Sequence, residues 1–258
     1  MSKRTEYNGL ASAVNHRGGS LVDKWYRSAQ RWLYPPYCTL CGALSSNDYE
    51  LCADCAADLV RIGEACTCCA LPLPRGGLCG RCQRRAPAFD GAQAVFEYQP
   101  PLDALVKRLK FHGDLHFARL LGGLMAEHLV QVSERLPEVI VPVPLHAARL
   151  RERGYNQALE LARPVARRLG VPLDWRHVTR IRATDPQTDV PAKLRARNVR
   201  NAFAVLPGWK PHSVAIVDDV MTTGHTLDAL AETLRRAGVS EVRVWVCARA
   251  VFGRWALC

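Results

Sequence analysis

The stretch that most constrains the fold of this chain is Val214–Thr226, which reads V-A-I-V-D-D-V-M-T-T-G-H-T. It opens with four apolar residues, Val214–Val217, and such a run is typical of a strand buried in a parallel sheet. Two carboxylates come next, followed by a short segment rich in hydroxyl groups. Leucine and alanine then recur at helical spacing as far as Gly238. The order predicts a strand, a phosphate-sized loop and the start of a helix.

The same stretch suits a sugar phosphate as its ligand. Backbone N–H groups at a helix N-terminus attract phosphate, and threonine hydroxyls together with a glycine can complete the binding loop. Asp218 and Asp219 can accept hydrogen bonds from two neighbouring hydroxyls of a ribose, because open α/β sheets bind ligands at the carboxyl ends of their strands. An ordinary strand-to-helix turn with a threonine cap is the simpler alternative. The adjacent carboxylates favour the ligand loop.

Composition indicates a globular protein. The 258 residues are 48% hydrophobic and 23% charged. The sequence has no apolar run of the roughly 18 to 20 residues that cross a bilayer, and its first residues lack the apolar core of a signal peptide. We therefore expect no membrane span and a cytoplasmic protein. In that compartment thiols stay reduced, so clustered cysteines favour a metal site over disulfides.

The positive charge is concentrated in one part of the chain. The formal net charge is +11, and residues 149–200 hold 13 Lys and Arg against 5 Asp and Glu. An excess of this kind suits a polyanion, either a pyrophosphate or a nucleic acid. A solvated basic surface without a ligand is the alternative.

Nine of the 11 cysteines lie between Cys38 and Cys82. Eight of them form four C-x2-C pairs: Cys38 and Cys41, Cys52 and Cys55, Cys66 and Cys69, and Cys79 and Cys82. Tetrahedral zinc takes four thiolates, and a C-x2-C turn can aim two sulfurs at one ion. We therefore expect two structural zinc sites with four cysteines each, and zinc would supply stability that this segment's few large apolar residues cannot.

The spacing leaves the pairing of these cysteines open. Neighbouring pairs can combine, or the pairs can interleave. An iron–sulfur cluster or redox-active thiols are further alternatives to zinc. Cys68 is the odd thiol of the segment, and the sequence assigns it no role.

Strand and helix patterns alternate after a linker at residues 87–91. The predicted strands cover residues 92–98, 139–141, 178–181 and 242–248 besides Val214–Val217, and the predicted helices cover residues 102–109, 115–136 and 158–169. We therefore predict three parts: a tail with a short helix at 1–37, a cysteine-rich zinc-binding module at 38–86, and an α/β domain at 87–258. The domain is a doubly wound parallel sheet with helices on both faces.

Two segments of this domain are predicted to be functional loops. Arg149, Arg151 and Arg153 occupy alternate positions after a buried strand, and Gly154 follows them. Forked arginine donors in such a loop can wrap a second anion. The polar segment 184–198 is long for a plain connection, which favours a functional or mobile loop.

Val-Asp-Asp-Val-Met-Thr-Thr-Gly-His-Thr resembles the phosphoribosyl pyrophosphate loop of type I phosphoribosyltransferases. The cysteine pairs, the segment Arg-Glu-Arg-Gly-Tyr-Asn-Gln and this loop come in the order seen in the ComF family of competence proteins. The resemblance runs from about Cys38 to the C-terminus. It implies a zinc module followed by a phosphoribosyltransferase-like domain, and a role in DNA uptake and natural transformation.

The resemblance also implies roles for individual residues. Asp218 and Asp219 would act at the ribose hydroxyls, and Mg2+ would bridge pyrophosphate and ribose oxygens. The segment 184–198 would close over the site. The residues that would hold the 5′-phosphate are Thr222, Thr223, Gly224, His225 and Thr226, and those that would face the pyrophosphate are Arg149, Arg151, Arg153 and Gly154. The family usually has a small residue where His225 stands.

Two functions remain open at this point. In the first, the chain is a phosphoribosyltransferase that binds phosphoribosyl pyrophosphate and transfers its ribosyl phosphate to an acceptor that the sequence does not reveal. In the second, it is an accessory protein of DNA uptake that senses this ligand or binds single-stranded DNA, alongside competence and recombination proteins. His146 is a candidate base only by its location, and a structural role is the stronger hypothesis.

Overall fold

The computed structural model describes residues 36–45, 50–182 and 201–251. Most of the predicted N-terminal tail and helix, and the whole of the segment 184–198, lie outside the described residues. Among the described residues no helix has the length and apolar character needed to cross a bilayer.

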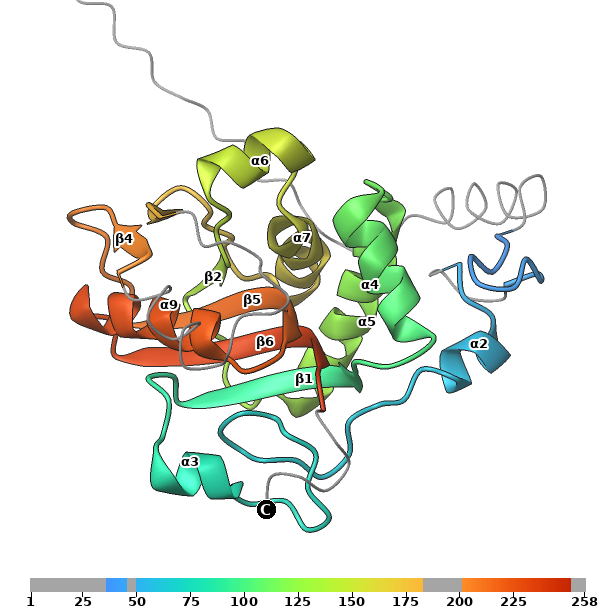
Figure 1. The fold of residues 1–258 in the computed structure, drawn as a ribbon, viewed down its shortest axis with the longest axis horizontal. Helices are drawn as coiled ribbons and strands as arrows, with labels where there is room; N and C mark the ends of the chain where they lie inside the picture. Colours follow the sequence, from blue (N-terminus) through green and yellow to red (C-terminus); the bar gives the residue numbers. More distant parts are fainter. Residues whose placement is uncertain (1–35, 46–49, 183–200, 252–258) are drawn as a thin grey trace, which may run out of the picture.

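A four-stranded parallel sheet forms the centre of the domain (Figure 1), with the strand order β1-β6-β5-β2. The strands are β1 (Gly91–Glu97), β2 (Val139–Pro142), β5 (Ser213–Met221) and β6 (Glu241–Arg249). Val214 lies opposite Val139 on one side and Val242 on the other, so β5 is a central strand. The four strands predicted at residues 92–98, 139–141, 214–217 and 242–248 are confirmed, and so is the parallel sheet.

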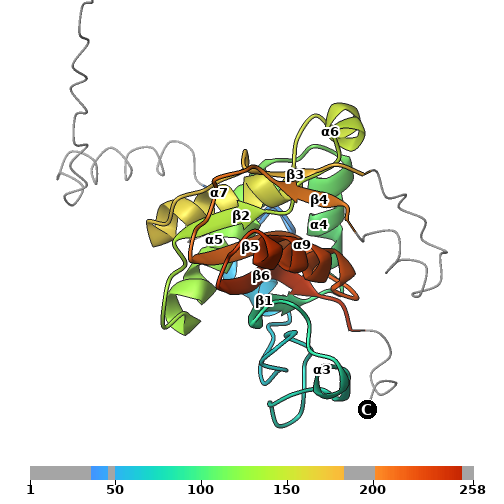
Figure 2. The same cartoon turned by 90° about the vertical axis from the view of Figure 1, so that its left-hand side faces the viewer.

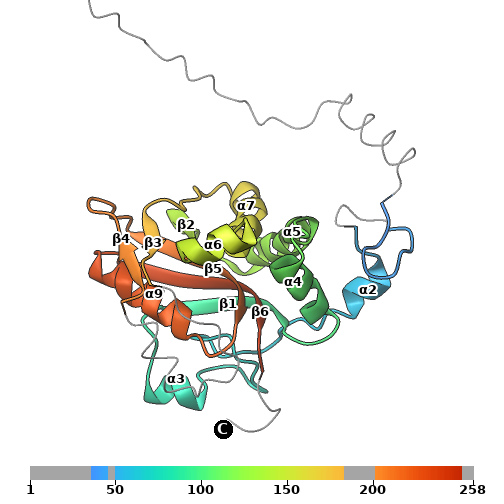
Figure 3. The same cartoon turned by 45° about the horizontal axis from the view of Figure 1, so that its top comes forward.

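Helices cover both faces of the sheet. The helices α4 (Leu102–Phe111), α5 (His116–Val132) and α7 (Gln157–Leu169) lie together on one side of the strands (Figure 3), and α9 (His225–Arg236) packs on the other. Side chains of β5 alternate between the two cores: Ala215 and Val217 belong to the first, Val214 and Ile216 to the second. Cys247 of β6 is fully buried.

The contact between α5 and α7 explains a glycine that weakens the helical pattern of residues 115–136. A Cβ added at Gly122 would lie 2.4 Å from the Cγ atom of Pro164 and 2.6 Å from the carbonyl oxygen of Leu161. Only glycine therefore allows the two helices to approach this closely. Pro164 stands inside α7, which continues to Leu169.

The strand predicted at residues 178–181 does not join the main sheet. Instead β3 (Val178–Arg180) pairs antiparallel with β4 (Phe203–Val205) in a separate two-stranded sheet. A single parallel bridge between His146 and Arg180 connects this small sheet to the segment after β2. The small sheet thus brings Arg180 close to the carboxyl ends of the main strands.

The arginine-rich segment is a helix, α6 (Ala147–Arg153), so the prediction of a loop there is wrong. His146 caps its N-terminus by accepting from the Ala148 N–H at 3.3 Å, and Gly154 ends it with a left-handed φ of 82°. Between these caps, alanine, leucine, arginine and glutamate all favour helix. Residues two apart on a helix point about 200° apart, so Arg149 and Arg151 leave α6 in different directions.

The cysteine-rich module contains two short helices, α2 (Ala53–Ala57) and α3 (Gly80–Arg84), which lie far apart on the domain (Figures 1 and 3). Beyond the β1 edge of the sheet lies α3 (Figure 2). The predicted linker at residues 87–91 is packed against the domain, since Phe89 is buried and the Asp90 carboxylate accepts from the Val242 N–H at 2.8 Å.

Candidate functional site

The candidate phosphate loop lies between β5 and α9. The sequence predicts that the strand ends before Asp218, but β5 continues to Met221 because its pairing with β6 continues to the register Met221↔Arg249. The loop is therefore short, and α9 begins at His225. Gly224 caps this helix with a left-handed φ of 80°, a conformation that favours glycine. The helix N-terminus predicted from Val214–Thr226 is confirmed.

The two carboxylates do not lie side by side, because consecutive residues of a strand point to opposite faces. Asp219 points toward α4, where the Lys110 Nζ atom lies 3.0 Å from its Oδ1 atom. Asp219 is only 3% exposed, and its Oδ1 atom also accepts from the Val220 N–H at 2.6 Å. Asp218 is partly exposed on the other face. Of the pair, Asp218 is thus the carboxylate that a ligand can reach.

The field around Asp218 makes its proton hard to remove. Burial and the neighbouring charge of Asp219 raise the pKa of Asp218 to about 7, against the opposing effect of Lys110 and Arg180. Burial alone would lower the pKa of Lys110, but Asp219 and Asp218 together raise it. The site therefore combines a firmly cationic lysine with a carboxyl group that titrates near neutral pH.

Of the three predicted arginines, Arg149 is the one that acts on the charged groups around Asp218. The charge of Arg149 acts on Arg180, and Arg180 in turn interacts with Asp218. Arg153 lies at the end of α6 and donates to the Gln157 side chain at 2.5 Å. Arg151 is exposed on another side of the same helix. The expectation that all three arginines wrap one anion is therefore not supported by the helix.

Lys110 and Arg180 were not predicted from the sequence as site residues. A helical projection carries the signal for Lys110: at 100° per residue it lies about 40° from Val106, at the margin of the apolar stripe of α4. Lys107 and Arg108 lie farther from that stripe. No comparable signal exists for Arg180, because only the tertiary position of the small sheet brings it to Asp218.

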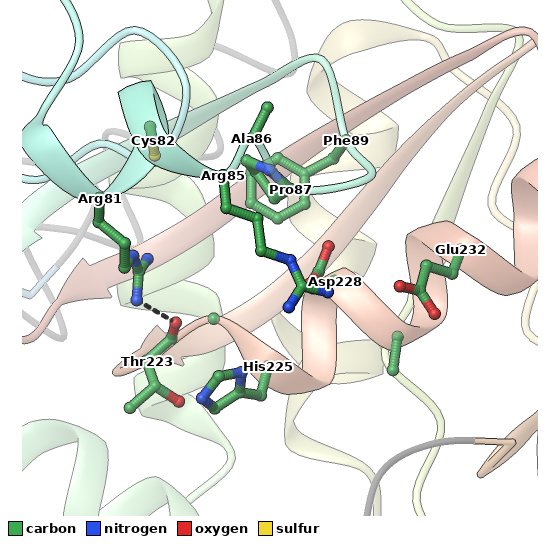
Figure 4. A pocket seen from close by; sticks show the side chains of 12 residues that line it. Arg81, Cys82, Arg85, Ala86, Pro87, Phe89, Thr223, His225, Asp228 and Glu232 are labelled. Carbon is green, nitrogen blue, oxygen red and sulfur yellow. Dashed lines mark hydrogen bonds between the residues drawn. The ribbon is translucent and has the colours of Figure 1, made fainter. Parts of the chain in front are cut away.

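A cavity of about 270 Å³ adjoins the phosphate loop on the side of the cysteine module (Figure 4). Across it, the Arg81 Nη1 atom of α3 donates to the Thr223 carbonyl at 2.8 Å. The Asp228 carboxylate of α9 accepts from the Ala88 N–H at 2.7 Å. Asp218 does not line this cavity. The lining residues are Arg81, Cys82, Arg85, Ala86, Pro87, Phe89, Thr223, Gly224, His225, Asp228, Ala229 and Glu232.

The eight paired cysteines form two clusters from neighbouring pairs. One is Cys38, Cys41, Cys52 and Cys55, and the other is Cys66, Cys69, Cys79 and Cys82. Within each cluster all sulfur atoms lie within 4.8 Å of one another. The Sγ atoms of Cys41 and Cys52 are 3.6 Å apart, and those of Cys69 and Cys79 are 3.7 Å apart. Sulfurs about 2.3 Å from a tetrahedral zinc would be about 3.8 Å apart, so the clusters fit zinc.

Backbone donors prepare one thiolate in each cluster. Burial opposes ionisation, yet backbone N–H groups lower the pKa of Cys38 to about 6 and that of Cys66 to about 7. The Cys79 N–H, for example, donates to the Cys66 sulfur at 3.3 Å. Cys68 is buried beside the second cluster but is not part of it. Thiolate ligands are what a structural zinc site needs.

Comparison with known proteins identifies the family. A DNA utilization protein YhgH from Salmonella typhimurium is 38% identical over 224 residues, which are 84% of this chain and 98% of that protein. Competence protein F from Haemophilus influenzae is 39% identical over 67% of this chain and 78% of that protein. This chain belongs to the ComF family. Residues 29–83 match the double zinc ribbon domain, and residues 156–251 match the phosphoribosyl transferase domain.

The ComF-family assignment agrees with the two halves of the structure. The double zinc ribbon match and the two cysteine clusters together support structural zinc. Among solved structures, a phosphoribosylpyrophosphate amidotransferase from B. subtilis is 24% identical over 50% of this chain and 25% of that chain, with a TM-score of 0.34. A likeness of this size is too weak to support a conclusion about function.

Proposed function

We propose that this ComF-family protein binds phosphoribosyl pyrophosphate with Mg2+ at the β5–α9 junction and transfers the ribosyl phosphate to an acceptor, with release of pyrophosphate. One observation carries this proposal: Gly224 turns the chain directly from a strand with an accessible carboxylate, Asp218, into the N-terminus of α9. A phosphate at that N-terminus would meet the backbone N–H groups of the first helical turn and the positive end of the helix dipole.

Each part of the site has a defined task in this proposal. The amides and hydroxyls of Thr222–Thr226 hold the 5′-phosphate, and Asp218 accepts from the ribose hydroxyls and would hold Mg2+. Mg2+ would ease the departure of pyrophosphate when bound. Asp219 is tied to Lys110 and fixes the end of β5, while Arg149 and Arg180 supply positive charge near the leaving group. The chemistry then rests on positioning and electrostatics.

We further propose that this activity serves the use of external DNA. The support comes from the relatives, which include DNA utilization proteins and competence proteins from Haemophilus influenzae and Streptococcus pneumoniae. The phosphoribosyl transferase domain supports the ligand class and leaves the acceptor open.

Isothermal titration with phosphoribosyl pyrophosphate and Mg2+ tests the binding step. In a titration at about pH 8, above the raised pKa of Asp218, we expect saturable binding to the unmodified protein and at least tenfold weaker binding to Asp218→Asn, which keeps the shape of the side chain and removes its charge. Asp54→Asn, an exposed aspartate on α2, is the control and should bind as the unmodified protein does. Absence of heat at millimolar ligand would refute the proposal. Pyrophosphate release, screened against nucleobases and amines, then identifies the acceptor.

A second candidate function, binding of single-stranded DNA, is favoured by one surface feature. Trp175 is 45% exposed, and the guanidinium groups of Arg163 and Arg176 lie 5.8 and 5.3 Å from its ring centre. An exposed aromatic ring between cations suits a base and its flanking phosphates. This surface lies on the α7 side of the domain and would act independently of the phosphate loop.

A further inference from the structure

We infer that the second cysteine cluster holds the phosphate loop in shape, so that zinc bound by Cys66, Cys69, Cys79 and Cys82 controls ligand binding at residues 222–226. The inference rests on the proposed function for its ligand, but its structural part can be tested without one. Two arginines, Arg249 and Arg81, connect the cluster to the loop.

Arg249 is the inner connection. It is the last residue of β6, and only 3% of it is exposed. Its Nε atom donates to the Cys69 carbonyl at 3.0 Å, and its Nη1 atom donates to the carbonyls of Met221 and Thr222 at 3.0 and 2.5 Å. One buried side chain therefore binds the backbone of a zinc ligand and the first residues of the loop.

Arg81 is the outer connection. It stands between the ligands Cys79 and Cys82 in α3, and its Nη1 atom reaches the Thr223 carbonyl (Figure 4). The carbonyls of three consecutive residues, Met221 to Thr223, thus all accept from arginines that touch the second cluster. These bonds turn the three carbonyls toward the module and fix the backbone that leads into the first turn of α9, where a phosphate would bind.

The two clusters differ in which core of the sheet they join. All four cysteines of the second cluster share a buried core with Met221 of β5 and Leu227 of α9. Cys38 and Cys52 of the first cluster pack into the other core, on the opposite face of the sheet, and α2 lies far from the loop (Figure 1). Only the second cluster is therefore in a position to shape the loop.

Loss of zinc from the second cluster should release the loop. Without the metal nothing holds the four sulfur atoms together, and a segment this poor in apolar side chains cannot keep its turns alone. The carbonyl of Cys69 would then leave Arg249, and α3 would carry Arg81 away from Thr223. A loop that must be ordered by its ligand binds that ligand more weakly than one already in place.

Matched cysteine variants of the full-length protein test the coupling. Cys52 and Cys79 are the third ligands of their clusters, and both stand at the N-cap position of a short helix. In Cys79→Ser we expect hydrogen exchange at residues 221–227 to accelerate at least tenfold, and in Cys52→Ser we expect less than a twofold change. Equal exchange at these residues in the two variants would overturn the inference. Zinc content, by mass spectrometry of the native protein, should fall by one ion in each.

Surface variants test the connection without loss of metal. Arg81→Met should keep both zinc ions, accelerate exchange in the loop about threefold or more, and weaken binding of phosphoribosyl pyrophosphate about tenfold. Arg84→Met, on the same helix, is the control and should change neither. Unchanged exchange in Arg81→Met would contradict the inference. If the unmodified protein binds no phosphoribosyl pyrophosphate, the proposed function fails, while accelerated exchange in Cys79→Ser still supports the zinc-dependent loop.

Discussion

At the scale of single residues, the Lys110–Asp219 pair is the most buried ion pair in the part of the chain that the structure describes. The side chains of Lys110 and Asp219 are only 23% and 4% exposed, and removing one member leaves a buried charge without its counterion. We predict that Lys110→Met lowers the free energy of unfolding by about 3 kcal/mol, within the range for a broken buried pair. Urea denaturation followed by circular dichroism measures this.

Two variants make the Lys110 experiment specific. The double variant Lys110→Met/Asp219→Asn removes both charges and should recover most of the loss, because neither partner is left ionised. Lys107→Met breaks a solvent-exposed pair with Asp103 on the same helix and should leave the unfolding curve unchanged. If Lys110→Met behaves like Lys107→Met, the pair contributes nothing of importance.

The raised pKa of Asp218 predicts a pH-dependent stability. The folded protein keeps this carboxyl group protonated up to about pH 7, whereas the unfolded chain releases the proton near its usual value of about 4. The unfolded state therefore binds fewer protons between these values, and Asp218 makes the protein less stable as pH rises from about 4 to about 7. Asp218→Asn should raise the melting temperature more at pH 8 than at pH 5.

The control for Asp218→Asn is Asp218→Glu, which keeps a titrating group at the same position. Its melting temperature should follow the pH dependence of the unmodified protein more closely than that of Asp218→Asn. The prediction fails if Asp218→Asn changes the melting temperature by the same amount at pH 5 and pH 8. Asp218 would then titrate alike in the folded and unfolded states.

At the scale of elements, the close approach of α5 and α7 gives a prediction at Gly122. A methyl group there would overlap the ring of Pro164 and the backbone of Leu161, so the helices must separate. We predict that Gly122→Ala lowers the free energy of unfolding by about 2 kcal/mol or more, within the range of overpacked cores. Gly63→Ala is the control, since a Cβ there would meet nothing within 4 Å. Comparable unfolding curves for the two variants would contradict the prediction.

Sequence patterns predicted the elements whose signal is local. Apolar runs located the parallel strands, and the recurrence of Leu227, Leu230 and Leu234 located α9. The prediction of a loop at Arg149–Arg153 failed because the caps of this helix are His146 and Gly154, and its few apolar residues show no helical period. The predicted end of β5 was too early because pairing with β6, a tertiary effect, extends the strand through Asp218 and Asp219. Helix propensity thus favours α6 although no apolar period marks it, whereas the end of β5 depends on a tertiary contact that no local signal carries.

At the scale of the whole molecule, the cysteine pairs predicted two clusters but not where they sit. Spacing fixes which turns can hold a metal and says nothing of the surface on which each turn packs. The second cluster packs against the phosphate loop through Arg249, the last residue of β6. No pattern in the sequence marks this arginine as part of the site. The site is thus built from segments about 180 residues apart in the chain.

Metal content gives a whole-molecule prediction. We expect two zinc ions per chain by elemental analysis, with a fall in the melting temperature after treatment with a chelator, because both clusters contribute residues to buried cores. Addition of zinc should restore the original melting curve, and addition of Mg2+, which prefers oxygen ligands, should not. A chelator-treated protein that is free of zinc and melts at the original temperature would contradict a structural role.

The net charge of +11 bears on the second candidate function. If the arginines around Trp175 contact the backbone of single-stranded DNA, the association constant must fall as salt rises, because each neutralised phosphate releases counterions. Contacts with about four phosphates predict a slope near −3 in a plot of log K against log salt concentration.

Fluorescence anisotropy with a labelled oligothymidine measures this slope. Arg163→Met should make the slope shallower by the contribution of about one phosphate. Trp175→Ala should weaken binding with little change of slope. Arg243→Met on β6 is the control and should change neither the affinity nor the slope. A slope near zero in the unmodified protein would remove the nucleic-acid function and leave the phosphate loop as the site to explain.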